Sequence, residues 1–139
     1  MRKLLLVLLI CTAVACTKDT AKMLISKKWV IESVTVMPAM TLGGKTDTNY
    51  IALSGPGSCV ANLSLSFAAD STYVAGANGA LCDMMADASV KTWKKDGDKI
   101  ILSASPFTPL SFDGKKLTQT TTTQQNGTTY TFVYTYKSK

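Results

Sequence analysis

Turn dipeptides separate short strand-like runs in the second half of this chain and restrict it to hairpins. Asp96-Gly97, Asp113-Gly114 and Asn126-Gly127 each lie between two runs of apolar and polar residues. Asp-Gly and Asn-Gly suit the tight turns whose twist matches that of paired antiparallel strands. Three such turns predict a sheet in which strands that are neighbours in the chain are also neighbours in space.

Similar runs extend back to Trp29. In residues 62–67, Leu63, Leu65 and Phe67 share one face and two serines share the other, which is the alternation of a half-buried strand. Strands are expected at 27–36, 48–54, 62–67, 72–77, 89–95, 98–104, 109–112, 115–124 and 128–137, with a loop at 37–47 and a short helix within 17–28. A meander of eight or nine strands removes its exposed edges by closing into an up-and-down barrel or a barrel-like sandwich. The sequence therefore predicts an all-β antiparallel fold.

The first fifteen residues have the parts of an export signal. Arg2-Lys3 is followed by the apolar run Leu4–Ile10, and small residues lead to Cys16. The apolar run is too short for a membrane-spanning helix, which needs about 20 residues. We expect a signal peptide over 1–15, a lipidated N-terminus and tether with the short helix over 16–26, and a barrel domain over 27–139.

The segment Ala13-Val14-Ala15-Cys16 resembles the lipobox of bacterial lipoproteins, in which a peptidase cuts before a cysteine that is then acylated. The resemblance implies that Cys16 is the lipidation site and that two or three acyl chains hold the protein at a membrane. Each buried methylene contributes ~0.8 kcal/mol, and stable anchoring takes more than one chain. The expected location is the bacterial cell envelope, at the periplasmic or surface face of the outer membrane. The alternative is an ordinary secretory signal with an incidental cysteine.

The composition argues against several classes of function. The net charge is +6, or +4 without Arg2 and Lys3, and the lysines are scattered along the sequence without interleaved aromatics, so nucleic-acid binding is not expected. The chain has no histidine, the usual general base near neutral pH and a common zinc ligand. Most acidic residues fall in turns, which explains them. We expect no catalysis, no metal and no cofactor.

Two cysteines remain after Cys11 leaves with the signal and Cys16 takes lipid. Cys59 and Cys82 would meet the oxidising space outside the cytoplasm, where a disulfide persists. If the strands run up and down in turn, the loop before residue 60 and the loop that contains Cys82 lie at the same end of the sheet. The sequence therefore predicts a Cys59–Cys82 disulfide, which contributes on the order of 3 kcal/mol in the chain-entropy model.

Four stretches resemble the small lipocalin-like lipoproteins of Bacteroidota. They are "KKWVIESVTV" with its opening tryptophan, "SCVANLSLSFAADSTYVAG…LC", "KTWKKDGDKIIL" and the aromatic "TTYTFVYTYK", and together they span residues 27–137. The resemblance implies a small antiparallel barrel that binds an apolar molecule.

Five residues are candidate ligand contacts: Trp29, Glu32, Phe67, Tyr73 and Trp93. The four aromatic side chains either line a cavity or fill the interior, because an eight-stranded barrel is just wide enough for either. Glu32 lies within a strand, on the valine-rich face opposite Trp29. It is a buried ligand contact if the valine face points inward and is solvated if the tryptophan face does; the cost of burying an unpaired carboxylate favours the solvated position.

Two functions are compatible with these observations. The first is a membrane-anchored envelope lipoprotein whose barrel binds a small apolar or amphipathic ligand without catalysis. The second is a surface-displayed interaction module (an inhibitor, an adhesin or an assembly subunit) with a filled core. They differ in what occupies the barrel interior.

Overall fold

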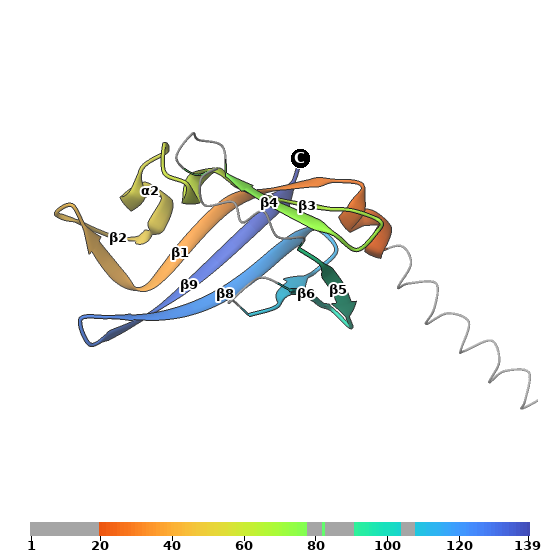
Figure 1. Cartoon of the computed structure of the whole chain (residues 1–139). Helices are drawn as coiled ribbons and strands as arrows, with labels where there is room; N and C mark the ends of the chain where they lie inside the picture. The colour runs from red at the N-terminus through yellow and green to blue at the C-terminus, as the bar shows by residue number, and fades with distance from the viewer. Residues whose placement is uncertain (1–19, 78–81, 83–90, 104–107) are drawn as a thin grey trace, which may run out of the picture.

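The computed structural model describes residues 20–77, 82, 91–103 and 108–139, and nine strands account for most of these residues. A short helix occupies residues 20–25, and two further helical segments, α2 (Tyr50–Ser54) and the 3-10 helix η1 (Val60–Asn62), lie between strands. The strands are β1 (Lys28–Leu42), β2 (Lys45–Asn49), β3 (Leu63–Phe67), β4 (Tyr73–Ala77), β5 (Trp93–Asp96), β6 (Lys99–Leu102), β7 (Leu110–Phe112), β8 (Lys116–Gln125) and β9 (Thr128–Ser138) (Figure 1).

Eight of these strands form a nearly closed antiparallel barrel. Their order is β4-β3-β1-β9-β8-β7-β6-β5, and β2 pairs only with the far half of β1, outside this path. The two ends of the order meet where the Tyr73 amide donates to the Lys91 carbonyl at 3.0 Å and the Trp93 amide donates to the Ser71 carbonyl at 2.8 Å. The all-β, up-and-down barrel expected from the turn signals is thus confirmed, with β2 as an added hairpin strand.

The segment after the first strand differs from the expectation. β1 continues to Leu42 and turns through Gly43-Gly44, both at positive φ, into β2, where a loop had been expected. The strand expected at 48–54 is wrong, because residues 50–54 form helix α2. The Asn49 side chain accepts a hydrogen bond from the Ala52 amide at 3.1 Å and so caps this helix. Since short apolar runs suit a strand or a helix equally, the pattern alone did not distinguish them.

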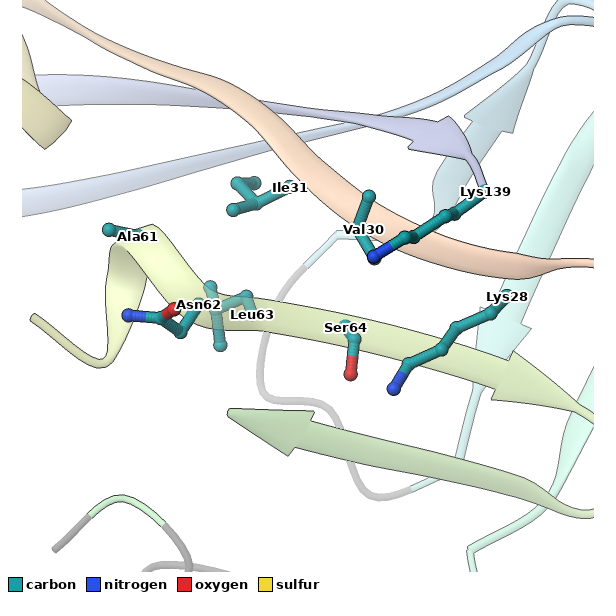
Figure 2. Close-up of a pocket in the computed structure, with 8 residues that line it drawn as sticks. All are labelled: Lys28, Val30, Ile31, Ala61, Asn62, Leu63, Ser64 and Lys139. Atoms are coloured by element: carbon teal, nitrogen blue, oxygen red, sulfur yellow. The ribbon is translucent and has the colours of Figure 1, made fainter. Parts of the chain in front are cut away.

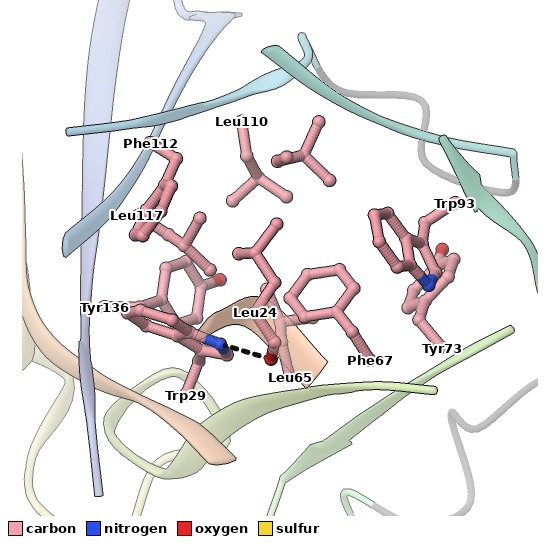
Figure 3. Packing of buried hydrophobic residues seen from close by; sticks show 11 residues of the cluster. Leu24, Trp29, Leu65, Phe67, Tyr73, Trp93, Leu110, Phe112, Leu117 and Tyr136 are labelled. Atoms are coloured by element: carbon pink, nitrogen blue, oxygen red, sulfur yellow. Dashed lines mark hydrogen bonds between the residues drawn. The ribbon is translucent and has the colours of Figure 1, made fainter. Parts of the chain in front are cut away.

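Buried apolar side chains form two clusters inside the barrel. The main core lies at the end where the chain enters, and consists of Leu24, Trp29, Leu65, Phe67, Tyr73, Trp93, Ile100, Leu110, Phe112, Leu117 and Tyr136 (Figure 3). The distal core consists of Val34, Val36, Met40 and Phe132, against which α2 packs.

The expected short N-terminal helix is confirmed, and it closes one end of the barrel. Its Leu24 side chain is fully buried in the main core, and the Leu24 carbonyl accepts a hydrogen bond from Trp29 Nε1 at 3.1 Å. This helix is therefore part of the folded domain and fixes where the preceding segment leaves the barrel. Within the described ranges, no helix has both the length and the apolar composition needed to cross a bilayer.

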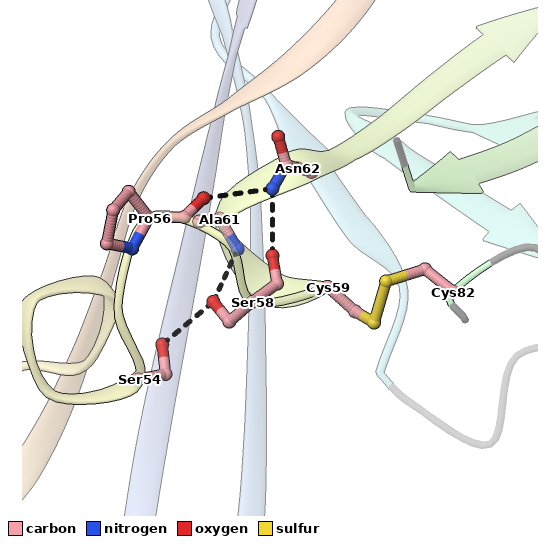
Figure 4. Close-up of a disulfide and its surroundings, with 7 residues drawn as sticks. All are labelled: Ser54, Pro56, Ser58, Cys59, Ala61, Asn62 and Cys82. Atoms are coloured by element: carbon pink, nitrogen blue, oxygen red, sulfur yellow. Dashed lines mark hydrogen bonds between the residues drawn. A yellow bond between two sulfur atoms is a disulfide. The ribbon is translucent and has the colours of Figure 1, made fainter. Parts of the chain in front are cut away.

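The disulfide between Cys59 and Cys82 is confirmed, with the two Cα atoms 5.5 Å apart (Figure 4). Cys59 directly precedes η1, in a segment held by local hydrogen bonds. The Asn62 side-chain amide donates to the carbonyls of Pro56 and Ser58, at 3.1 and 2.9 Å. The bridge therefore connects an ordered segment before β3 to the connection that follows β4.

Candidate functional site

The four aromatic candidates for ligand contact lie together in the main core. Trp29, Phe67, Tyr73 and Trp93 come from β1, β3, β4 and β5, and their exposed fractions are 1, 4, 6 and 8%. The rings of Phe67 and Trp93 meet edge to face, with centroids 5.4 Å apart, and Trp93 Nε1 donates to the Ala68 carbonyl at 3.2 Å. In Figure 3, Trp29 and Phe67 lie on either side of Leu24, and Trp93 and Tyr73 lie together on the far side of Phe67. The structure places the four side chains in one buried cluster.

Buried aliphatic side chains surround this group. Leu24, Ile100, Leu110 and Leu117 each have an exposed fraction of 0% and belong to the same cluster. Trp29 contacts the edge of Phe112 with ring centroids 5.5 Å apart. An eight-stranded barrel is wide enough for a filled core or a ligand cavity, and the burial of these described side chains favours the first.

Glu32 is separated from the aromatic group by an irregularity in β1. Opposite β9, the register passes from Ile31 paired with Tyr136 to Ser33 paired with Thr135, so Glu32 has no counterpart. An extra residue of this kind is a β-bulge, and it changes which residues of the strand face inward. Trp29 before the bulge and Val34 after it are therefore both buried, whereas Glu32 is on the outer surface. The two positions predicted for Glu32, buried or solvated, both assumed that side chains alternate between the two faces of an uninterrupted strand.

An ion pair holds the Glu32 carboxylate on the outside of the barrel. Lys116 Nζ on β8 lies 2.6 Å from Glu32 Oε2, across the intervening strand β9. The hydrogen bond from Lys116 lowers the pKa of Glu32, and the charges of Lys116 and Lys137 act in the same direction. The same contact raises the pKa of Lys116. Both groups are therefore charged at neutral pH, and Glu32 is not poised to act as a proton donor.

Replacing Lys116 by glutamine should raise the pKa of Glu32 toward its ordinary value of 4.5, because the main cause of the lowering is removed. NMR titration of the Glu32 carboxyl carbon measures this shift. The ion pair stabilises the fold above pH 4.5, and this contribution disappears as the pH falls through the lowered pKa of Glu32. The stabilities of the wild type and the variant should therefore converge in acid. Lys115→Gln, one residue away, is the control that should leave the Glu32 titration unchanged; an unshifted titration in Lys116→Gln would contradict the assignment.

A shallow groove lies on the outer face, where β1 and β3 separate. The two strands pair only from Lys28 to Val30 on the β1 side, and beyond that point η1 follows the edge of β1. The groove has a volume of about 200 Å³ and is lined by Lys28, Val30, Ile31, Ala61, Asn62, Leu63, Ser64 and Lys139. In Figure 2 the lysine side chains lie at one end and Ala61 and Asn62 at the other. The groove therefore combines an apolar floor with two cations.

The lysines of this groove were not among the residues singled out from the sequence. They lie far apart in the chain, at its first strand and at residue 139, and the strand alternation was applied to apolar residues only. A usable signal did exist, because closing an up-and-down barrel pairs its first strand with its last. That pairing brings Lys28 beside Lys139, whose amide donates to the Lys28 carbonyl at 2.8 Å.

Other predicted features stay predictions. The signal peptide and Cys16 lie outside the described residues. In the part of the chain that the structure describes, no three cysteine, aspartate or glutamate side chains gather where they could hold a metal ion. Comparisons with protein-family models, curated proteins and solved structures found no match for this chain.

Proposed function

We propose that this chain is a lipid-anchored protein of the bacterial envelope whose lipocalin-like barrel is a non-catalytic interaction module. In this proposal the barrel core is filled, and binding takes place on the outer surface. The observation that supports it is the burial of Trp29, Phe67, Tyr73 and Trp93 in one apolar cluster, with exposed fractions of 8% or less.

The same packing argues against a ligand inside the main core. Sites for small molecules commonly enclose about 300–1,000 Å³ and leave their lining side chains accessible when empty. Leu24 and Leu110 face the centre of the cluster in Figure 3 and have no exposed surface. A molecule could enter only by displacing these side chains. The outer surface, which includes the groove between β1 and β3, is the accessible alternative.

Native mass spectrometry tests the filled core directly. The full chain, extracted from membranes with a mild detergent and freed of it in the gas phase, should show the mass of the processed, acylated protein with nothing else bound. A co-purified apolar molecule that survives this treatment would overturn the filled core and restore the first function considered above, the binding of a small ligand in the barrel.

The anchor is tested by replacing Cys16 with serine in the full chain. Without the thiol that accepts lipid, the variant should accumulate as an unprocessed precursor without fatty acid. Intact-mass measurement of the membrane fraction reports both changes. Cys11→Ser is the matched control, since Cys11 lies within the predicted signal and its loss should leave processing and acylation intact. Normal processing and soluble secretion of Cys16→Ser would show that the segment is an ordinary secretory signal.

A further inference from the structure

Four lysines gather on one outer wall of the barrel, although they are scattered in the sequence. Lys28 on β1 lies opposite Lys139, one position from the paired residues Trp29 and Ser138. Lys116 on β8 pairs directly with Lys137 on β9. All four are exposed, because their strand neighbours Trp29, Leu117 and Tyr136 point inward. We call Lys28, Lys116, Lys137 and Lys139 the lysine patch.

The lysine patch places like charges opposite one another on paired strands, an arrangement that destabilises a sheet. Among the described residues, only Lys116 of the four forms an ion pair, with Glu32. Asp113 is also near Lys116, but its carboxylate accepts the backbone N–H groups of Lys115 and Lys116 at the turn before β8. Lys28, Lys137 and Lys139 form no ion pair among the described residues, although the charge of Lys137 also acts on the Glu32 carboxylate. An anionic surface would relieve this repulsion.

The lysine patch lies at the end of the barrel where the N-terminal segment leaves. The helix over residues 20–25 ends just before β1, and its Lys22 and the following Lys27 are also exposed. Three residues, 17–19, connect the predicted lipid attachment at Cys16 to the start of this helix. At about 3.5 Å per residue, the four steps from Cys16 to Thr20 reach no more than roughly 14 Å. An acylated Cys16 would thus hold this end of the barrel close to the bilayer surface, within about two Debye lengths at physiological salt.

Charges at this end are distributed unevenly around the barrel. The β3–β4 turn contains Asp70, and the β5–β6 hairpin contains Asp96 and Asp98 beside Lys94, Lys95 and Lys99, so the charges of these two connections offset one another. The β5–β6 hairpin lies away from the wall formed by β1, β9 and β8, whereas the β3–β4 turn follows β3, which pairs with β1. A negatively charged bilayer would therefore attract the lysine wall more strongly than the side formed by β5 and β6, which favours one rotation of the barrel about its anchor.

We propose that the lysine patch docks on the anionic headgroups of the bilayer that holds the lipid anchor. This inference rests on the proposed anchor at Cys16 and adds the face that the barrel presents to the membrane. Acyl chains supply the attachment, and the lysines fix the orientation. The opposite wall, β5 to β7, would then face away from the membrane and be available to partners.

Amine labelling on vesicles tests this docking. The acylated full chain is added to preformed phosphatidylcholine vesicles with or without phosphatidylglycerol, and a water-soluble acylating reagent is applied. Because each lysine near an anionic surface gains about fivefold in apparent affinity, Lys28, Lys137 and Lys139 should label at least about fivefold more slowly on phosphatidylglycerol vesicles. Lys45 and Lys94, on β2 and β5, should label equally on both. High salt should remove the difference.

Two triple variants with the same change of net charge complete the experiment. Lys27 adjoins the lysine patch and should also label more slowly on phosphatidylglycerol vesicles in the wild type. This protection should disappear in Lys28→Gln/Lys137→Gln/Lys139→Gln and remain in Lys45→Gln/Lys94→Gln/Lys99→Gln. Acylated protein whose patch lysines label equally on both vesicles would overturn the docking and leave the anchor intact. Protein without fatty acid on Cys16 would instead reject the anchor, and the docking with it, so the two failures are distinguishable by intact mass.

Discussion

Replacing Trp29 by alanine is expected to lower the free energy of unfolding by about 3–5 kcal/mol, the usual cost of truncating a large aromatic side chain in a core. Trp29 is 1% exposed, packs edge to face on Phe112 and donates its Nε1–H to the Leu24 carbonyl. The truncation therefore leaves a large void and an unpaired buried carbonyl, and it frees the N-terminal helix. Urea denaturation followed by circular dichroism measures the loss, which is a large part of the stability of an ordinary domain.

Two variants show which interactions are responsible. Trp29→Phe keeps a ring in the core and removes the hydrogen bond to Leu24, so it should cost about 1–3 kcal/mol. Val74→Ala changes a side chain that is 68% exposed and should alter stability by no more than about 0.5 kcal/mol. A loss of less than about 1 kcal/mol in Trp29→Ala would mean that the surroundings of the ring are already loose. That result would weaken the filled core on which the proposed function rests.

The hairpins were predictable because their signals are local. Asn126 and Gly127 both have positive φ, at 51° and 78°, and join β8 to β9 as the dipeptide indicates. Asp96-Gly97 and Asp113-Gly114 likewise lie at the turns between β5 and β6 and between β7 and β8. Each of these assignments needs only a few consecutive residues. Barrel closure then follows from the number of strands and their short connections.

Features that depend on contacts between distant residues were not predictable in the same way. Asn49 caps helix α2, which is a local signal, but the helix is also held by Tyr50, Ile51 and Leu53, whose contacts with the distal core no local pattern reveals. The bulge at Glu32 depends on how β1 pairs with β9. An alternation argument assigns both faces correctly only where a strand is regular, so it could not place Glu32.

The candidate site was predictable in part for the same reason. Burial of the four aromatic residues follows from their type and position in strands, but whether they line a cavity depends on how all the interior side chains fit together. The lysine patch combines residues from the first and the last two strands, so composition reports scattered lysines where the folded surface has a cluster. Pairing the first strand with the last, as closure of the barrel requires, would have predicted the lysine patch.

The double variant Cys59→Ser/Cys82→Ser is expected to lower the free energy of unfolding by about 3 kcal/mol. The bridge joins residues 23 positions apart, and in the chain-entropy model a loop of this size restricts the unfolded chain by that amount. The loop contains β3 and β4. The bridge therefore restricts the chain next to the hydrogen bonds that close the barrel between β4 and β5, which we call the seam. Chemical denaturation measures the loss. Hydrogen exchange at the Tyr73 and Trp93 amides, which span the seam, should become faster.

Ser58→Ala is a suitable control for this variant, because it removes the side-chain hydrogen bonds next to Cys59 and keeps the bridge. It should cost about 0.5–1.5 kcal/mol and leave the seam amides unchanged. Single replacement of either cysteine should expose one thiol that reacts with a maleimide, whereas the folded wild type should not react at these two positions. Reaction of both thiols in the folded wild type would mean that no bridge forms. Closure of the barrel would then depend on the seam hydrogen bonds and the aromatic core alone. The loss of free energy of unfolding in Trp29→Ala would then remove a larger share of the total stability.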